Sequence, residues 1–525
     1  MSTEHVDVLV IGAGLAGIGA ACRLRTEHPG RSVAVLESRE RSGGTWDLFR
    51  YPGIRSDSDM FTFGFHWRPW PGDTALADGP LILDYLRTVA HEYGVDALIR
   101  YRHRVTSASW DSETARWTVE VERDGEPVTI TTSFLWACSG YYDYERGYAP
   151  ELPGQERFGG EIVHPQHWPE DLDHSGKRVV VIGSGATAIT LVPAMAETAA
   201  HVTMLQRSPT YVLSRAGRDP LARLLRRLPQ RLAYPAVRWS NILTAIGFYQ
   251  LSRRRPGLVK RVIRSQTAKQ LPDGMDVDEH FKPVYDPWDQ RVCFVPDGDL
   301  FKALRRGTAA VVTDTIETFT ERGIRLTSGR ELEADLVVTA TGLRLLPFGG
   351  IDLHVDGAPV ELSRTMAYKA LMLSGVPNFA YTIGYTNASW TLKADLVADY
   401  VCRLLRHLDE RGATSVVAVR DPAVGEQPFL DFKAGYVLRD LDRLPKQGDR
   451  APWLLKQNYV TDLRTIRRGE VEDGVLTFTG GTSAGIRPAA YPHNPGGSDG
   501  TGRQAEQQGR GPGRQGQGGH RQGHG

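Results

Sequence analysis

Two glycine-rich turns are the first segments whose residue types and spacing could do chemistry. In one, Gly12-Ala13-Gly14-Leu15-Ala16-Gly17 follows a short apolar run, and Glu37 stands twenty residues after Gly17. Such glycines permit a tight turn and let backbone N–H groups approach a pyrophosphate, and the following helix adds partial positive charge. A carboxylate at the end of the next strand can accept hydrogen bonds from ribose hydroxyls. The pattern predicts a dinucleotide site formed by Gly12, Gly14, Leu15, Gly17 and Glu37.

The second turn, Gly183-Ser184-Gly185-Ala186-Thr187-Ala188, is followed by a base, Arg207, where the first is followed by an acid. An acid would repel a 2′-phosphate, whereas a guanidinium can hold it with two hydrogen bonds. The second nucleotide is therefore predicted to be NADPH rather than NADH. An exposed strand-end arginine is the alternative interpretation of Arg207. The expected contacts are Gly183, Ser184, Gly185, Ala186, Thr187, Arg207 and Ser208.

A third segment, residues 43–59, combines Gly43-Gly44-Thr45-Trp46 with a Pro-Gly loop that carries Asp57. Paired glycines let the backbone approach a flat cofactor closely. An acid in a Pro-Gly loop is poorly suited to a hydrophobic core but well suited to a functional site. Thr45, Trp46 and Asp57 are therefore candidate cofactor-binding residues. From the residues alone, a surface loop and an active-site loop are equally open.

A fourth segment, residues 158–169, contains His164 and His167, which could be metal ligands. No cluster of acids or cysteines accompanies the two histidines, so we expect no metal site.

These motifs need strands and helices to position them. The apolar runs 6–11 and 33–36 are typical of strands around a helix at 16–24, and the same order returns at 178–207. Each unit predicts the start of a parallel sheet. The expected fold class is α/β, with two Rossmann-like dinucleotide-binding domains and helical elaboration.

The 525 residues are too many for one hydrophobic core. The alternating stretches 116–138 and 325–341 each end in an apolar strand followed by Ser-Gly or Thr-Gly, and we interpret these points as crossings between domains. The predicted organisation is a discontinuous first domain at 1–145 and 335–480, and a second domain at 150–330.

A basic segment interrupts the second domain at about 208–285. Residues 208–270 contain 14 Lys or Arg against one acid, Asp219, and apolar residues recur at helical spacing, namely Trp239, Ile242, Leu243 and Ile246. One interpretation is a helical insert with a solvated basic face. The other is a helix that lies on a membrane surface.

The overall composition argues against several other classes of protein. The net charge of +1 does not favour a nucleic-acid partner. The four cysteines form no CxxC pair, which argues against a dithiol redox centre and fits a reducing cytoplasm. The N-terminus lacks a signal-peptide pattern, and no apolar run is long enough for a membrane span. Residues 481–525 are rich in Gly, Gln and Arg, and we expect them to be disordered.

The residues of the fourth segment carry a resemblance. Phe158, Gly160, His164, Trp168 and Pro169 match the fingerprint of the Baeyer–Villiger monooxygenases. The resemblance implies an FAD-binding first domain, with FAD at the first glycine turn, and an inserted NADPH-binding domain.

The resemblance also implies two catalytic residues. Arg291 falls where the family keeps its catalytic arginine, and Asp57 falls where the family keeps the acid that pairs with this arginine. The preceding residue is Gln290, where the family often has lysine, so one phosphate contact is expected to be lost.

The implied reaction uses FAD and NADPH to put one oxygen atom of O2 into a ketone, giving an ester, or to oxidise sulfur in thioamides or sulfides. Two alternatives stay open. One is a flavin monooxygenase that hydroxylates nitrogen or sulfur without Baeyer–Villiger activity. The other is a scaffold that binds both nucleotides without turnover. The expected partners are a small ketone or sulfur substrate and O2, with peripheral membrane association through the basic insert as a further option.

Overall fold

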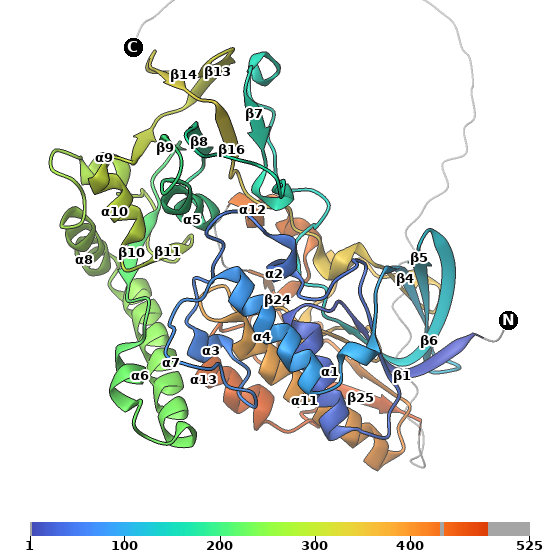
Figure 1. The fold of residues 1–525 in the computed structure, drawn as a ribbon. Coiled ribbons are helices and arrows are strands. Elements are labelled where there is room, and N and C mark those ends of the chain that lie inside the picture. Colours follow the sequence, from blue (N-terminus) through green and yellow to red (C-terminus); the bar gives the residue numbers. More distant parts are fainter. Residues whose placement is uncertain (1–2, 431–434, 481–525) are drawn as a thin grey trace, which may run out of the picture. The chain divides into compact units, whose positions relative to one another are not determined.

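A computed structural model describes residues 3–430 and 435–480 of the chain (Figure 1). The disorder expected for residues 481–525 lies outside the described residues. By their contacts, residues 1–482 group into one compact unit. Within the described ranges no helix is both long and apolar enough to cross a membrane.

The first glycine turn belongs to a nine-stranded mixed sheet in the order β18-β17-β4-β5-β6-β1-β2-β3, with β21 also paired to β6. β1 pairs in parallel with both β2 and β6, while β4, β5 and β6 form an antiparallel meander. The strands are β1 (Glu4–Ile11), β2 (Val33–Leu36), β3 (Ile99–Arg100), β4 (His103–Asp111), β5 (Arg116–Arg123), β6 (Glu126–Ala137), β17 (Asp352–Val355), β18 (Ala358–Pro359) and β21 (Phe379–Tyr381).

The second glycine turn belongs to a five-stranded sheet, whose strands all run parallel in the order β12-β9-β8-β16-β7. Its central strands are Val- and Ile-rich and buried, as expected where helices and strands cover both faces of a parallel sheet. The strands are β7 (Glu161–Val163), β8 (Arg178–Ile182), β9 (His201–Gln206), β12 (Ala309–Thr313) and β16 (Leu336–Thr339).

The chain passes twice between these sheets. It leaves the nine-stranded sheet after β6, which ends at Ala137, and returns to it at β17 after β16 ends at Thr339. The expected hairpin at 116–138 is confirmed, since β5 and β6 pair across a turn at Asp124 and Gly125. The domain boundaries stay a prediction, because the contacts join both sheets into one unit.

Helices complete the layers on the sheets. α1 makes its most extensive helix contact with α11, and α4 also packs on α1, as Figure 1 shows. α5 follows the second glycine turn and packs against α10. The bounds are α1 (Leu15–Glu27), α2 (Thr45–Leu48), α3 (Met60–Phe63), α4 (Gly79–Glu92), α5 (Ala186–Met195), α10 (Asp299–Arg306), α11 (Trp390–Arg411), α12 (Gly435–Leu438) and α13 (Tyr459–Asp462).

The basic segment is mainly helical, with α6 (Pro220–Leu225), α7 (Gln230–Arg254), α8 (Pro256–Ala268) and α9 (Val277–His280). It also contains a strand that was not expected, β10 (Tyr211–Arg215), which pairs in parallel with β11 (Val292–Pro296). The Tyr-Val-Leu run of β10 is buried between that partner and α8, and burial favours its extended form.

The apolar residues that recur at helical spacing on α7 are not all covered. Ile242 is buried, whereas Trp239 is 40% exposed and Leu243 is 58% exposed. Only part of the helix packs on the rest of the protein, so helical spacing alone could not decide which residues are covered.

Small two- and three-stranded sheets fill the remaining chain. They are formed by β13 (Ile316–Thr320), β14 (Gly323–Leu326), β15 (Glu331–Glu333), β19 (Ala367–Tyr368), β20 (Met372–Leu373), β22 (Ser415–Ala418), β23 (Glu426–Pro428), β24 (Lys446–Gly448) and β25 (Leu476–Thr479).

Candidate active site

One large cavity, of about 1530 Å³, touches both glycine turns. Pockets for drug-sized ligands usually measure roughly 300–1,000 Å³, so this one has room for more than one small molecule. Of the site residues predicted from the sequence, Gly17 is the one that does not line the cavity. The others that line it are Gly12, Gly14, Leu15, Glu37, Thr45, Trp46, Asp57, Gly183, Ser184, Gly185, Ala186, Thr187, Arg207, Ser208 and Arg291.

The first turn shows why glycine is needed at two of its positions. Gly12 has φ of +99°, and a Cβ there would lie 2.8 Å from the carbonyl oxygen of Cys138. A Cβ on Gly17 would lie 1.8 Å from the carbonyl oxygen of Gly12. Gly17 therefore lets α1 pack tightly on the turn and does not face the cavity. Gly14, at the N-cap of α1, lines the cavity instead.

Glu37 is buried at the end of β2, and its side chain organises the backbone around the first turn. One carboxylate oxygen accepts a hydrogen bond from the N–H of Ala13 at 2.8 Å, and the other accepts one from the N–H of Arg39 at 3.0 Å. Each oxygen can accept a further bond. Glu37 can thus hold the turn and still accept ribose hydroxyl hydrogens.

The second turn repeats this construction in the five-stranded sheet. Gly183 has φ of +134°, and a Cβ there would lie 2.4 Å from the carbonyl oxygen of Ala340. Gly185 is the N-cap of α5, and a Cβ there would meet nothing within 4 Å. Open space in front of a helix N-terminus is where a phosphate binds.

Arg207 follows β9 and lies at the edge of the same cavity, with its side chain exposed. Its neighbour Ser208 is held in place because the Ser184 hydroxyl donates to the carbonyl oxygen of Ser208 at 3.0 Å. Both residues therefore border the space in front of the second turn.

Asp57 and Arg291 come together in the cavity although 234 residues separate them in sequence. Nη1 of Arg291 lies 3.0 Å from Oδ2 of Asp57. The two side chains are 38% and 32% exposed, so the pair contributes only about 0–1 kcal/mol to folding. The pair matters because Asp57 orients the guanidinium of Arg291.

The loop that carries Arg291 is positioned by the insert helices. Trp288 has the left-handed φ of +73°, which is costly for a non-glycine residue. Its ring packs edge-on against Phe248 and Tyr249 of α7. Arg253 of α7 forms an ion pair with Asp289 at 2.7 Å.

A neighbouring ion pair joins Lys260 of α8 to Asp286 at 2.6 Å. The insert thus supports the loop from two helices. No motif in the sequence pointed to this function, because the contacts join segments far apart in the chain.

An arginine cluster beside the first turn was missed in the sequence. Asp47 is buried and shared by three guanidiniums, Arg39 at 2.8 Å, Arg87 at 2.9 Å and Arg50 at 3.6 Å. Arg39 lines the cavity, and its Nη1 donates to the carbonyl oxygen of Gly44 at 3.3 Å. Arg50 also pairs with Glu170, so two carboxylates against three cations leave one positive charge in surplus next to a predicted pyrophosphate site.

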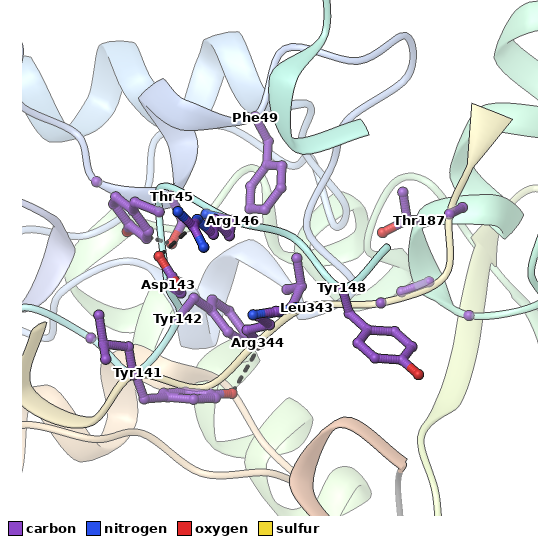
Figure 2. A pocket seen from close by; sticks show the side chains of 18 of the residues that line it. Thr45, Phe49, Tyr141, Tyr142, Asp143, Arg146, Tyr148, Thr187, Leu343 and Arg344 are labelled. Carbon is purple, nitrogen blue, oxygen red and sulfur yellow. Dashed lines mark hydrogen bonds between the residues drawn. The ribbon is translucent and has the colours of Figure 1, made fainter. Parts of the chain in front are cut away.

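The two crossings between the sheets also line the cavity, as Figure 2 shows for Tyr141, Tyr142, Asp143, Tyr148 and Arg344. They run antiparallel to each other: the N–H of Asp143 donates to the carbonyl oxygen of Arg344 at 3.0 Å, and the N–H of Tyr148 donates to that of Gly342 at 3.1 Å. The walls between the two turns are therefore made by linkers.

The first linker is also bonded to the glycine loop of residues 43–59. The hydroxyls of Tyr144 and Thr45 lie 3.0 Å apart. Burial raises the pKa of Tyr144 to about 12, so this phenol stays protonated and available as a hydrogen-bond donor.

The fingerprint residues lie outside the cavity wall. A Cβ on Gly160 would lie 2.6 Å from the carbonyl oxygen of Asp335, and Phe158 packs edge-on against Phe319. The ring of His164 would collide with a Cβ on Gly147 of the first linker, and burial lowers the pKa of His164. Of these three fingerprint residues, His164 packs on the first linker, whereas Phe158 and Gly160 pack against Phe319 and Asp335.

His167 is bonded to the same linker, with Nε2 at 2.9 Å from the carbonyl oxygen of Glu145. Within residues 3–430 and 435–480, no group of three or more His, Cys, Asp or Glu side chains is placed to hold a metal ion.

Comparisons with known proteins agree on the class. A family model described as flavin-binding monooxygenase-like matches residues 73–231, and one described as an NAD(P)-binding Rossmann-like domain matches residues 10–77. The FAD-containing monooxygenase EthA of Mycobacterium tuberculosis is 56% identical over 479 residues, which cover 91% of this chain and 98% of EthA. EthA of Mycolicibacterium smegmatis is 54% identical over 480 residues, covering 91% and 98%.

Solved structures share the fold at lower identity. A steroid monooxygenase bound to NADP has a TM-score of 0.73 at 23% identity, covering 91% of this chain and 100% of that one. An open form of cyclohexanone monooxygenase has a TM-score of 0.67 at 20% identity, covering 79% and 90%.

The fold and the relatives together define a flavoprotein monooxygenase. The chain belongs to the family of FAD-containing monooxygenases that includes EthA. The predicted α/β fold class and the predicted flavin monooxygenase class are thereby confirmed.

Proposed function

We propose that this protein uses NADPH and FAD to insert one oxygen atom of O2 into a ketone, giving an ester, and that it also oxidises sulfur in thioamides or sulfides. In the ketone reaction, ketone, O2, NADPH and a proton give ester, NADP+ and water. The observation that carries the proposal is the Arg291–Asp57 pair, which lies in the cavity that both glycine turns border.

The residues present fit both nucleotides. FAD would lie at the first turn, where Glu37 accepts ribose hydroxyl hydrogens and the surplus charge around Asp47 favours a pyrophosphate. The contacts assigned to FAD are Gly12, Gly14, Leu15, Glu37, Thr45, Trp46 and Asp57. Gly17 contributes indirectly, because it lets α1 pack tightly on the turn.

NADPH would lie at the second turn, where Gly185 leaves open space at the N-terminus of α5. Arg207 and Ser208 would hold the 2′-phosphate, and Gly183, Ser184, Ala186 and Thr187 would contact the remainder of the nucleotide. Gln290 also lines the cavity but brings no charge to a phosphate.

FAD, when bound and reduced by NADPH, supplies the activation of O2. The protein's task is then to place a fixed cation where negative charge develops on the oxygen that is transferred. Arginine suits this position, because its guanidinium stays protonated at any working pH. One such donor is commonly worth about 3–4 kcal/mol in the transition state. Asp57 would orient Arg291 and temper its charge.

The test is to supply the purified flavoprotein with NADPH, O2 and a linear ketone, and to identify the product by mass spectrometry. We expect an ester that carries one 18O atom when 18O2 is used. Oxidation of amines or sulfides without any ester would favour the hydroxylating alternative. NADPH oxidation that yields only H2O2 with every ketone and sulfide would favour the scaffold that binds nucleotides without turnover.

We also propose that the basic insert at 208–285 holds the protein at an anionic membrane surface. Its charge supports this, since residues 208–285 carry 15 Lys or Arg and five Asp or Glu, and four of the five acids lie within the short segment 273–279.

A further inference from the structure

Exposed apolar side chains are concentrated in the insert. Of the thirteen large hydrophobic side chains that are exposed among the described residues, eight lie in the 39-residue segment 224–262. Contiguous exposed apolar surface on a soluble protein usually marks an interaction site. The eight are Leu224, Leu228, Leu232, Trp239, Leu243, Leu251, Leu258 and Val262.

The same segment carries charge of one sign. Residues 224–262 contain nine Lys or Arg and no Asp or Glu. Three of the nine are paired with acids outside the segment, namely Arg238 with Asp395, Arg253 with Asp289 and Lys260 with Asp286. The other six leave the segment basic. A basic, apolar helical surface is complementary to anionic lipid, because the cations are attracted to the headgroups and the apolar side chains enter the acyl boundary. A second copy of the chain fits this surface poorly, since a two-fold contact would face two basic surfaces against each other.

Three of the exposed side chains form a stripe on α7. Leu232, Trp239 and Leu243 are seven and four residues apart, which places them on one face of the helix. They are 60%, 40% and 58% exposed. We call these three residues the α7 stripe.

A second cavity, of about 460 Å³, opens beside the α7 stripe, and Trp239 belongs to both. Its aromatic wall also includes Tyr234 of α7 and Tyr459 of α13. The cavity is also lined by Arg467 and Arg468, at the end of the π-helix Leu463–Arg467 that follows α13.

The charges around this cavity are not balanced. Arg467 is paired with Asp399 at 3.0 Å. Arg238, which is buried in the wall, donates to the carbonyl oxygen of Phe61 at 2.6 Å and lies 3.4 Å from Asp395.

Arg468 is exposed at the mouth, and no described residue forms an ion pair with it. His66, which also lines the cavity, accepts a hydrogen bond from Nη2 of Arg467 at 3.0 Å, and its Nδ1 lies 3.0 Å from Oδ2 of Asp395. The cavity therefore offers one uncommitted guanidinium beside aromatic walls.

We infer that this cavity binds the phosphate of an anionic phospholipid headgroup, with Arg468 as the main contact, while the α7 stripe enters the acyl boundary beside it. The inference rests on the membrane association proposed above and adds the site and the lipid chemistry. The aromatic wall suits the interfacial region, where amphipathic rings are favoured.

The experiment is co-sedimentation of the full FAD-loaded protein with vesicles of phosphatidylcholine alone, or of phosphatidylcholine with phosphatidylglycerol. We expect binding only to the anionic vesicles, and weaker binding at high salt. Arg468→Ser should weaken the partition coefficient about fivefold, as loss of one basic contact predicts. Arg330→Ser is the matched control, because Arg330 is an exposed arginine in a turn remote in sequence from the insert, and its binding should not change.

A second pair of variants tests the stripe. Leu232→Ser with Leu243→Ser should weaken anionic-vesicle binding about tenfold. Leu81→Ser should not weaken it, since Leu81 is about as exposed, at 51%, but lies on α4. All variants should keep the wild-type rate of NADPH oxidation with a water-soluble ketone.

The outcomes separate the two proposals. Wild-type protein that binds neither kind of vesicle would overturn both the membrane association and the headgroup site. Anionic-vesicle binding that Arg468→Ser leaves unchanged would overturn the headgroup site alone. A dimer in solution that Leu232→Ser with Leu243→Ser dissociates would show a second copy on the stripe and overturn the inference.

Discussion

Single residues define what this cavity can do. Arg291 and Asp57 are both partly exposed, so their pairing adds little to stability and its significance is chemical. Arg207 lines the cavity and is exposed, so a 2′-phosphate could reach it. Both arginines can be removed without leaving a buried carboxylate unpaired, which makes their variants clean tests.

Arg291→Ala should keep FAD bound but lower kcat for ester formation by about 10²–10³-fold, since one preorganised cation is lost from the transition state. The flavin absorbance of the purified variant is the control for cofactor binding, and steady-state ester production is the measurement. Arg291→Lys should recover part of the rate because it keeps a positive charge. Unchanged ketone oxidation by the alanine variant would remove Arg291 from the reaction.

Arg207→Ala should raise KM for NADPH by roughly 10–100-fold, as expected for loss of a charge-assisted hydrogen bond to phosphate. KM for NADH should change little, because NADH has no 2′-phosphate. Both constants are measured from initial rates with the same ketone. Equal effects on the two nucleotides would show that Arg207 acts elsewhere.

Elements determine where these residues stand. The insert helices α7 and α8 hold the loop at 285–291 through the packing of Trp288 and two ion pairs. α1 packs tightly on its turn because Gly17 has no side chain. In both cases, the position of a residue that lines the cavity depends on contacts made by another element of the fold.

Asp289→Asn should lower kcat by a few-fold to about tenfold and leave the KM for NADPH unchanged. The ion pair to Arg253 restrains the loop, and small misplacement of a catalytic group is costly to the rate. Steady-state kinetics separate the two constants. Asp124→Asn, in the exposed β5–β6 turn, is the matched control and should behave as wild type.

Gly17→Ala should destabilise the protein by at least about 1–3 kcal/mol, because the new Cβ would lie 1.8 Å from the carbonyl oxygen of Gly12. Thermal unfolding and the bound FAD content are the measurements, and both should fall. Gly30→Ala should change neither, since a Cβ at Gly30 meets nothing within 4 Å. A stable Gly17 variant with full FAD content would contradict the packing assigned to this glycine.

At the scale of the whole molecule, the site depends on two sheets brought to one cavity. The paired linkers at 141–148 and 342–346 line it, and His164 of the fingerprint packs on the first of them. Deletion of residues 481–525 tests how much of the chain this architecture requires.

A protein that ends at residue 480 should keep its FAD content, its thermal stability and its ester-forming activity. The removed residues are rich in Gly, Gln and Arg and include few apolar side chains, so we expect them to contribute little to a core. Absorbance spectra, thermal unfolding and steady-state kinetics of the truncated and full chains are compared. Loss of folding on truncation would show that the tail packs on the rest of the protein.

Local patterns sufficed to predict the two glycine turns, their strands and helices, and the contrast between Glu37 and Arg207. These features depend on backbone conformation and on spacing within about thirty residues, and such short-range rules can be read from sequence. The candidate catalytic pair was named through the family resemblance, since nothing near Asp57 in the sequence indicates Arg291.

The tertiary structure alone decided which distant segments meet. It brought Asp57 to Arg291, gave Asp47 three arginines, and made cavity walls from the linkers. It also left Trp239 and Leu243 exposed while burying Ile242 on the same helix, which helical spacing did not determine. A side chain is covered only where another element packs on it, and that depends on the path of the whole chain rather than on its local pattern.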